Sequence, residues 1–289
     1  MVASLEELAS ASTDEQWLDA IVEASKQSVV GGVRFPSLPS PVWQSNFVGM
    51  SGENAIRDGF RFYRFVRDEY QRLTGKPLDR ATRTLDFGCG WGRFLLLFMK
   101  DIGRDALFGV DVDPDVVGFC KVSGIPARLA TVPAYGPTSF EAQSFDLIYA
   151  YSVFSHLAEP AHLAWIDEFR RILRPNGVLV ITTQARHFVQ QVEEMHAKAK
   201  DALTPWERTL VTYLKNTDQI LTSYDGGRFV YVRTGGGAHR DGTFYGEALV
   251  PEQFMVSRYP RELELKRFIN DKSKFAQAIA VLQATDHAI

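Results

Sequence analysis

Residues 85–93 read LDFGCGWGR: a short apolar run carries an acid, Asp86, and three glycines follow it at alternate positions. Glycine lacks a β-carbon, so it accepts backbone angles with positive φ and lets the main chain approach a ligand closely. The N–H groups of such a turn, and of the first turn of a following helix, have no helical partners and can bind a polar group. The stretch therefore predicts a strand, a sharp turn and a helix, with the turn cradling a polar ligand.

The spacing of these glycines, Gly88, Gly90 and Gly92, separates two kinds of cradle. A dinucleotide-binding turn has the pattern G-x-G-x-x-G, in which the third glycine lets helix and strand pack closely. Here Arg93 occupies the position where that third glycine would stand. A P-loop is excluded because no G-K-[ST] follows the turn. A pyrophosphate site is thus disfavoured, although Arg93 could itself bind an anion.

Short apolar runs alternate with amphipathic stretches on both sides of this turn. Among the runs are ALFGVD (106–111), FDLIYAY (145–151) and VLVITT (178–183), and LAWIDEFRRIL (163–173) has helical spacing. Such alternation predicts parallel βαβ units, and right-handed crossovers then give a doubly wound, Rossmann-like, mostly parallel sheet of the α/β class. Ligands of such sheets bind at the carboxyl ends of the strands.

The flanking segments have other patterns. Residues 4–29 and 53–74 are expected to be helical, and the glycine- and proline-rich segment 31–52 between them irregular. Residues 186–225 interrupt the alternation with further helices. Residues 228–250 predict two strands joined by a glycine-rich loop, and residues 261–284 predict a final antiparallel hairpin at the sheet edge.

Composition limits the class of protein. The chain has 289 residues, a formal net charge of −3 and 45% hydrophobic residues, which allows a sizeable core. A nucleic-acid partner is not expected, because gripping phosphates requires clustered excess Lys and Arg. Two cysteines give no disulfide framework or metal cluster, and neither a secretion signal nor an 18-residue apolar run is present. We expect a soluble cytoplasmic protein without membrane partners; the oligomeric state cannot be inferred.

Three further blocks follow the glycine turn: GVDVDP (109–114), SFDLIYAYSVFSHL (144–157) and LRPNGVLVITT (173–183). Together with the turn, an acid followed by G-x-G-x-G, they resemble the ordered motifs of class I S-adenosylmethionine-dependent methyltransferases of the small-molecule type. The resemblance covers roughly residues 80–185, and the terminal hairpin fits the family's usual end. It implies a seven-stranded sheet with an antiparallel edge strand. It also implies S-adenosyl-L-methionine as cofactor and S-adenosyl-L-homocysteine as product.

On this resemblance the chain divides into four regions. They are an N-terminal helical lid region (1–80), a cofactor-binding core (81–185), a helical cap insertion (186–245) and C-terminal strands that complete the core sheet (246–289).

The resemblance also implies which residues contact the cofactor. Asp111 would hold the ribose diol, since one carboxylate accepts hydrogen bonds from both hydroxyls; a helix N-cap is its alternative role. Asp86 would lie near the methionine amino group, or else cap its strand by binding loop amides. No acid follows the third strand, so the adenine edge would meet backbone groups instead. The expected contact set is Asp86, Gly88, Cys89, Gly90, Gly92, Arg93, Asp111, Val112, Thr131, Val132 and Tyr151.

Methyl transfer requires the acceptor, the methyl carbon and the sulfur to be held in line, and an oxygen acceptor also benefits from a base. The candidate catalytic residues are His239, in the glycine-rich stretch GGGAHRDG, Glu247 and His156. Pairing with Glu247 would orient the His239 imidazole. In similar enzymes a histidine at the place of His156 often has a structural role, so deprotonation of the acceptor is its second interpretation.

The favoured function is methylation of a hydroxyl on a small molecule or glycan. Methylation of a protein or of a nitrogen acceptor, by an enzyme of the same fold, is the first alternative. An NAD-binding Rossmann oxidoreductase and a non-catalytic methyltransferase-like subunit are the other two. Arg93 disfavours the oxidoreductase, and the intact glycine set with Asp111 disfavours the non-catalytic subunit.

Overall fold

The computed structural model describes residues 4–237 and 239–285. Contacts between Cα atoms divide the chain into two compact units. Unit 1 comprises Met1–Val132, Ala142–Tyr149 and Asn176–Val178, and unit 2 comprises Pro133–Glu141, Ala150–Pro175 and Leu179–Ile289. Each unit therefore combines segments that lie far apart in the sequence.

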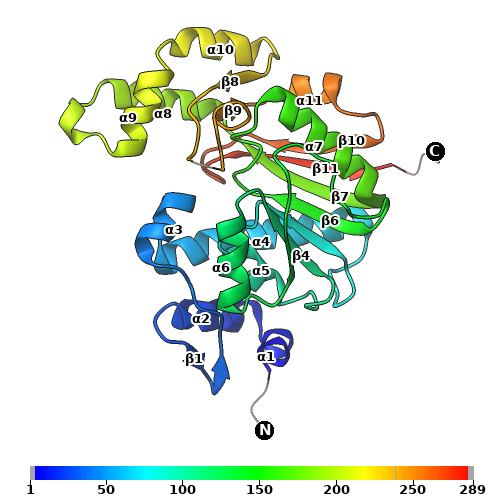
Figure 1. Ribbon diagram of the computed structural model, residues 1–289. Coiled ribbons are helices and arrows are strands. Elements are labelled where there is room, and N and C mark those ends of the chain that lie inside the picture. The colour runs from blue at the N-terminus through cyan, green and yellow to red at the C-terminus, as the bar shows by residue number, and fades with distance from the viewer. Residues whose placement is uncertain (1–3, 238, 286–289) are drawn as a thin grey trace. The chain divides into compact units, whose positions relative to one another are not determined.

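The main sheet has seven strands. They are β3 (Thr84–Phe87), β4 (Leu107–Asp111), β5 (Arg128–Thr131), β6 (Phe145–Ala150), β7 (Leu173–Thr183), β10 (Leu263–Ile269) and β11 (Ala278–Ala284). Their order is β10-β11-β7-β6-β3-β4-β5 (Figure 1). β3 pairs in parallel with β4 and β6, β4 pairs in parallel with β5, and β10 pairs with β11 in the antiparallel sense. The predicted mostly parallel seven-stranded sheet with an antiparallel edge is confirmed.

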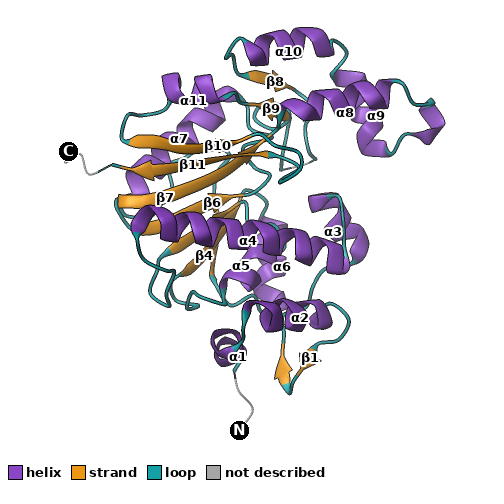
Figure 2. Cartoon of the chain, turned by 180° about the vertical axis from the view of Figure 1, so that it is seen from behind, coloured by secondary structure: helices purple, strands orange, loops and turns teal. Residues whose placement is uncertain are grey.

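Unit 1 carries the first six helices and a small hairpin. These elements are α1 (Leu5–Ala11), α2 (Asp14–Ala24), β1 (Val29–Val30), β2 (Val33–Arg34), α3 (Pro41–Val48), α4 (Gly52–Thr74), α5 (Arg93–Phe98) and α6 (Pro114–Ser123). The long helix α4 packs on α5 (Figure 2). The ring centroids of Phe62 and Phe94 lie 5.3 Å apart, and those of Tyr63 and Phe98 lie 5.0 Å apart. This packing fixes the helix that leaves the glycine turn.

The N-terminal segment differs from expectation in two places. The helical character expected of residues 4–29 is confirmed over α1 and α2, but the extended Ser12 separates the two helices, Thr13 starts α2 with a capping box, and residues 25–29 are not helical. The Thr13 hydroxyl accepts from the Gln16 amide at 3.2 Å, and the Gln16 side chain accepts from the Thr13 amide at 2.8 Å. The segment expected to be irregular contains α3, which Ser40 caps and Pro41 begins.

Unit 2 carries the remaining helices and a second hairpin. These elements are α7 (Glu159–Ile172), α8 (Arg186–His196), the 3-10 turn η1 (Lys200–Ala202), α9 (Pro205–Tyr213), α10 (Thr217–Asp225), β8 (Val230–Val232), β9 (Glu247–Leu249) and α11 (Glu252–Arg258). The helices predicted within 186–225 and the strand pair predicted within 228–250 are confirmed, whereas α11 was not anticipated. Helices α8, α9 and α10 enclose an apolar cluster that includes Phe188, Leu210 and Tyr224. None of the described helices has the length and apolar character that crossing a bilayer requires.

Candidate functional site

The glycine turn lies between β3 and α5 in unit 1. Gly90 and Gly92 have φ angles of 51° and 83°, in the left-handed region that a side chain disfavours. At Gly92 an added β-carbon would also lie 2.9 Å from Ile125. The amides of Gly88 and Cys89 donate to the Val110 carbonyl at 2.8 and 2.9 Å. The turn is therefore tied to the end of β4, the neighbouring parallel strand.

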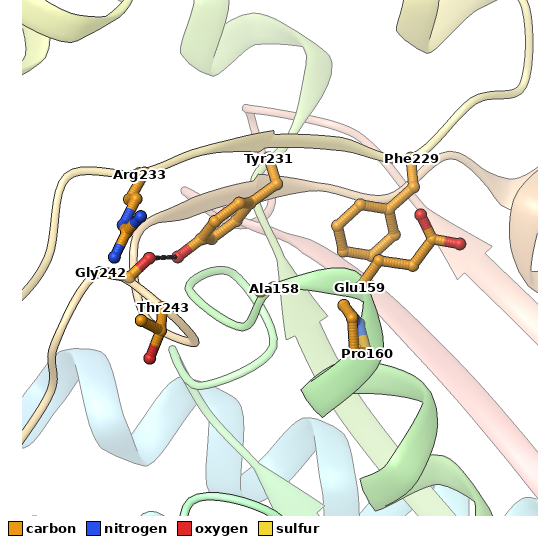
Figure 3. A pocket seen from close by; sticks show the side chains of 8 residues that line it. All are labelled: Ala158, Glu159, Pro160, Phe229, Tyr231, Arg233, Gly242 and Thr243. Carbon is orange, nitrogen blue, oxygen red and sulfur yellow. Dashed lines mark hydrogen bonds between the residues drawn. The ribbon is translucent and has the colours of Figure 1, made fainter.

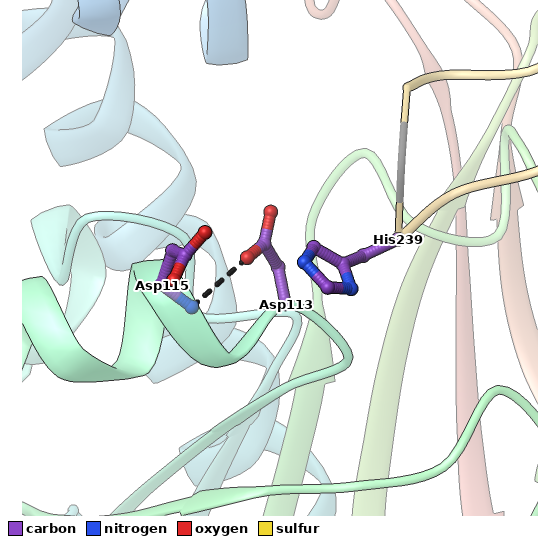
Figure 4. Close-up of side chains that lie close together, drawn as sticks. All are labelled: Asp113, Asp115 and His239. Carbon is purple, nitrogen blue, oxygen red and sulfur yellow. Dashed lines mark hydrogen bonds between the residues drawn. The ribbon is translucent and has the colours of Figure 1, made fainter.

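Asp111 is the residue that joins the turn to this strand end. One of its carboxylate oxygens, Oδ2, accepts from the Gly90 amide, and the other, Oδ1, accepts from the Asp113 amide, both at 3.0 Å. Helix α6 is capped by Asp113, whose side chain accepts from the Asp115 amide at 3.0 Å (Figure 4). The N-cap role considered for Asp111 thus belongs to Asp113, and Asp111 lies at the mouth of the glycine turn.

Asp86 lies on β3, directly before the turn, and is 1% exposed. Its oxygen Oδ2 is buried and has no hydrogen-bond partner among the described residues. Burial, and next the nearby charge of Asp111, raise the pKa of Asp86 well above its usual range. The Tyr149 hydroxyl opposes this shift, although the pair does not reach hydrogen-bond geometry. Because the amides of Gly88 and Cys89 bond Val110, the structure gives no support to a strand-end cap by Asp86.

The Arg93 side chain contacts helix α4 instead of lining an anion-binding site. This side chain is 4% exposed, donates to the Ala55 carbonyl of α4 at 2.7 Å and lies 3.6 Å from Asp58. Gly59 of α4 leaves room for it, since an added β-carbon would lie 3.1 Å from Arg93 Cδ. This guanidinium fastens α4 to the start of α5, so the expected cofactor contact of Arg93 has no support in the structure.

The other cofactor candidates take several environments. Cys89 is buried in the turn, and the neighbouring Cys120 together with burial raises the pKa of its thiol. Thr131 pairs with Asp111 across β4 and β5, and the Val132 amide donates to the Asp111 carbonyl at 3.0 Å. Val112 is half-buried beside Asp111. The structure thus groups these residues in unit 1, while Tyr151 is half-buried in unit 2, directly after β6.

Two of the three catalytic candidates, His156 and Glu247, meet in unit 2. Glu247 is buried, with Oε2 2.6 Å from the Gln184 amide nitrogen Nε2 and 3.6 Å from His156 Nδ1. Burial raises the pKa of Glu247, an effect that His156 and Gln184 oppose. His239 lies in an exposed turn. The acid that the sequence offered as a partner for His239 is therefore placed beside His156.

The hydrogen bonds of His156 determine which ring nitrogen carries its proton. Nδ1 lies 2.7 Å from the Gly246 carbonyl oxygen, which can only accept, so Nδ1 carries the hydrogen of the neutral ring. Nε2 then holds a lone pair. The imidazole stacks on the Tyr245 ring at 4.8 Å and 13°, and the His156 carbonyl accepts from the Gly246 amide at 2.7 Å. The ring is thus held in one orientation with its basic nitrogen fixed.

A polar network that the sequence did not reveal holds the loop before His156. The Gln277 amide donates to the hydroxyls of Ser152 and Ser155 at 3.0 and 3.2 Å and accepts from Thr182 at 2.6 Å. Thr182 also accepts from the Ser152 amide at 2.7 Å. Ser152 has a φ of 58°, unusual for a residue with a side chain, and such strain persists where surrounding contacts impose it.

Comparison with known proteins identifies the family. The family model described as methyltransferase domain matches residues 57–225, more than half of the chain. The chain belongs to the class I S-adenosylmethionine-dependent methyltransferases. This methyltransferase is 29% identical over 149 residues to a trans-aconitate 2-methyltransferase of Azoarcus sp. (strain BH72), a match covering 51% of the chain and 54% of that protein. It is 28% identical over 126 residues to a probable methyltransferase, ltbC, of Aspergillus luteorubrus, covering 38% and 43%.

The chain thus spans about half the length of the curated relatives it matches. Among solved structures, the PH0226 protein from Pyrococcus horikoshii OT3 aligns with a TM-score of 0.53 at 15% identity, covering 85% of this methyltransferase and 96% of that chain. At this identity the likeness concerns the fold. The family match also removes the support for an NAD-binding oxidoreductase.

S-adenosylmethionine is the cofactor of this family, and the residues around the turn suit it. An ammonium group would supply the hydrogen-bond donor that the buried Oδ2 oxygen of Asp86 lacks. Asp111 offers a carboxylate at the adjacent strand end, where ligands of such sheets bind. The turn between them has no side chains at Gly88 and Gly90, so backbone can approach the ligand.

Proposed function

We propose that this methyltransferase transfers the methyl group of S-adenosylmethionine to a hydroxyl oxygen of a small molecule. The observation that carries the proposal is the Asp111 carboxylate, which accepts the Gly90 amide at the ends of two adjacent parallel strands. When bound, S-adenosylmethionine supplies an electrophilic methyl group. Asp111 holds the ribose hydroxyls, and Asp86 the methionine ammonium, so that the methyl group is presented in one orientation.

His156 is the residue we assign as general base. Its Nδ1 is occupied by the Gly246 carbonyl, so Nε2 is the nitrogen that takes the proton of the acceptor hydroxyl as the new bond forms. The resulting imidazolium is stabilised by Glu247, 3.6 Å from Nδ1. This arrangement supports an oxygen acceptor over a nitrogen acceptor that is already unprotonated and needs no base. His239 remains the second candidate, because it lies in an exposed turn of the same unit.

A small molecule is the acceptor class that the relatives favour. The name of the Azoarcus relative specifies trans-aconitate, a small organic acid. A glycan acceptor gains no support from these relatives. Methylation of a protein side chain stays an alternative, which an acceptor screen with peptides would reveal.

Calorimetry with S-adenosylhomocysteine tests the cofactor site. The unaltered protein is expected to bind it, and Asp111→Ala to weaken binding about 100-fold, since it removes two charge-assisted hydrogen bonds from the ligand. Asp105→Ala is the matched control, because its carboxylate is 87% exposed and pairs only loosely with Arg128 at 3.4 Å. Equal binding by both variants would remove Asp111 from the site.

An acceptor screen scored by release of S-adenosylhomocysteine tests the reaction. Hydroxylated small molecules, amines and peptides are compared with the same protein and cofactor. Turnover of amines or peptides alone would contradict hydroxyl methylation. Cofactor binding without any turnover would favour the non-catalytic subunit.

A further inference from the structure

Residues 229–233, FVYVR, alternate between two environments in unit 2. Val230 and Val232 pack against the apolar cluster of α8, α9 and α10. Successive side chains of a strand point to opposite faces, so Phe229, Tyr231 and Arg233 share the other face. One face of this short strand therefore packs on the apolar cluster. On the other face the Phe229 ring also packs against His162 and Phe254, with centroids 5.2 and 5.1 Å away, and Phe229, Tyr231 and Arg233 line a pocket.

The second face lines a pocket of about 480 Å³, a volume typical of small-molecule sites. The start of α7, at Ala158–Pro160, and the loop residues Gly242 and Thr243 complete its lining (Figure 3). Arg233 and Glu159 lie towards opposite ends of this pocket, with the rings of Tyr231 and Phe229 between them (Figure 3). The pocket thus has an aromatic wall with a cation at one end and an anion at the other.

Two glycines leave space for the side chains that form this aromatic and charged wall. Neither Gly242 nor Gly246 has a positive φ, so backbone conformation does not require glycine at either position. A β-carbon at Gly242 would lie 2.7 Å from Arg233 Cγ. One at Gly246 would lie 2.2 Å from the Val232 carbonyl oxygen and 2.9 Å from the Tyr231 ring. The Tyr231 hydroxyl also donates to the Gly242 carbonyl at 3.0 Å. The Tyr231 ring is therefore held in place, while the exposed Arg233 side chain passes over Gly242.

The two charged side chains at the ends of the pocket, Arg233 and Glu159, differ in their partners. Among the described residues, the Arg233 guanidinium has no hydrogen-bond or ion-pair partner, while the nearby Asp241 carboxylate already accepts from the amide and hydroxyl of Thr243. The Glu159 carboxylate lies 3.7 Å from Arg258. An arginine fork matches the geometry of a carboxylate, whereas an anion next to Glu159 would be repelled.

The pocket is continuous along the chain with the proposed base. Val232 pairs with Glu247 at the end of this antiparallel ladder, and Arg233 and Gly246 are the adjacent residues of the two segments. The Ala158 amide donates to the Phe244 carbonyl at 2.8 Å, two residues after His156. The backbone segment that holds the His156 imidazole therefore also forms the pocket wall.

We propose that this pocket binds the methyl acceptor, and that the acceptor is a flat, aromatic monocarboxylic acid whose carboxylate pairs with Arg233. The proposal rests on the methyltransferase function above. It assigns Tyr231 and Phe229 to the acceptor's ring, and Glu159 to the exclusion of a second carboxylate at the far end.

Fluorescence titration with 6-hydroxy-2-naphthoate and its uncharged analogue 6-hydroxy-2-naphthamide, in the presence of S-adenosylhomocysteine, tests the assignment. The unaltered protein is expected to bind the acid at least about tenfold more tightly than the amide. Arg233→Gln should reduce this ratio to about one. Gly242→Ala should do the same, because its β-carbon displaces Arg233. Trans-aconitate, a tricarboxylate, should bind more weakly than the naphthoate. Glu159→Gln should reduce this difference in affinity between the two ligands.

Two control variants separate local from general effects. Arg228→Gln removes an exposed arginine directly before this segment, and Gly118→Ala adds a methyl group where nothing lies within 4 Å; both should keep the native ratio. An acid-to-amide ratio near one in the unaltered protein, or an unchanged ratio in Arg233→Gln, overturns the pocket assignment while cofactor binding leaves the methyltransferase proposal standing. Failure to bind S-adenosylhomocysteine would contradict the proposed function. The ratio of acid to amide affinity would still show whether the pocket binds a carboxylate.

Discussion

The glycine turn of unit 1 and the His156 loop of unit 2 are built in opposite ways. The turn is made from consecutive residues whose backbone is held by the adjacent strand end, through Val110 and Asp111. The imidazole of His156 is held by residues from distant segments, namely Gly246 and Glu247. The proposed cofactor side is thus encoded locally, and the proposed acceptor side is assembled by long-range contacts. Substitutions in the two regions should therefore impair different properties of the protein.

The largest effect is expected at His156. Replacement of His156 by Gln keeps a polar side chain but removes the basic nitrogen, so kcat should fall about 10²- to 10⁴-fold, the usual contribution of a general base. Binding of S-adenosylhomocysteine should change less than about twofold, because His156 lies outside the glycine turn. Steady-state kinetics and calorimetry on the same preparation measure both. A fall in cofactor affinity as large as the fall in kcat would contradict the idea that the two regions have separate roles in cofactor binding and turnover.

Gly92→Ala is expected to damage the turn itself. The new β-carbon combines a φ of 83° with a contact of 2.9 Å to Ile125, which should lower the free energy of unfolding by about 1–3 kcal/mol. Chemical denaturation measures the change, and Gly118→Ala, with open space and an ordinary φ, is the control. The two alanine variants having the same stability would show that the turn relaxes freely.

Gln277→Leu tests the long-range network of unit 2. The substitution removes the hydrogen bonds to Ser152, Ser155 and Thr182, which should lower kcat about tenfold by loosening the loop that carries His156. Cofactor affinity should stay unchanged. Retention of kcat together with reduced stability would assign the network to folding alone.

The effect expected to be smallest, counted per unit of pH, concerns Asp86. Because burial raises the Asp86 pKa, the carboxyl group of the ligand-free protein is protonated to a higher pH than an ordinary aspartate, whereas an ammonium ligand favours the ionised form. Affinity for S-adenosylhomocysteine should therefore rise with pH, by at most about tenfold per unit, until the pH passes that pKa. Calorimetry from about pH 5 to about pH 8 measures the slope.

Asp86→Asn supplies the comparison for this slope, since it has no titrating group at that position. Its affinity should be lower and flat over the same range. The raised pKa also means that the ionised carboxylate costs stability, so the ligand-free protein should lose stability as pH rises above about 3.8, and Asp86→Asn should lose less. An identical pH profile for both proteins would contradict a role for Asp86 in holding the ammonium.

The same contrast explains what could be predicted from the sequence. Alternating apolar runs, the turn glycines and the acid that ends β4 are local patterns, so the sheet and the position of Asp111 followed from them. The contact of Arg93 with α4 could not be predicted, because the sequence does not show that α4 covers this residue. Gln277 could not be found at all, since its partners Ser152 and Ser155 lie 125 and 122 residues away and glutamine carries no motif.

The alternation of FVYVR also has a use in protein engineering. Positions 231 and 233 can be randomised together while Val230 and Val232 are kept, because the valines contribute to the apolar cluster. Phe229 is also kept, because its ring packs 5.2 Å from His162 and 5.1 Å from Phe254. A combinatorial library confined to these two codons would sample new ligand preferences at little risk to folding. Every clone would also share an unmodified cofactor turn, so differences in turnover would report directly on the diversified surface.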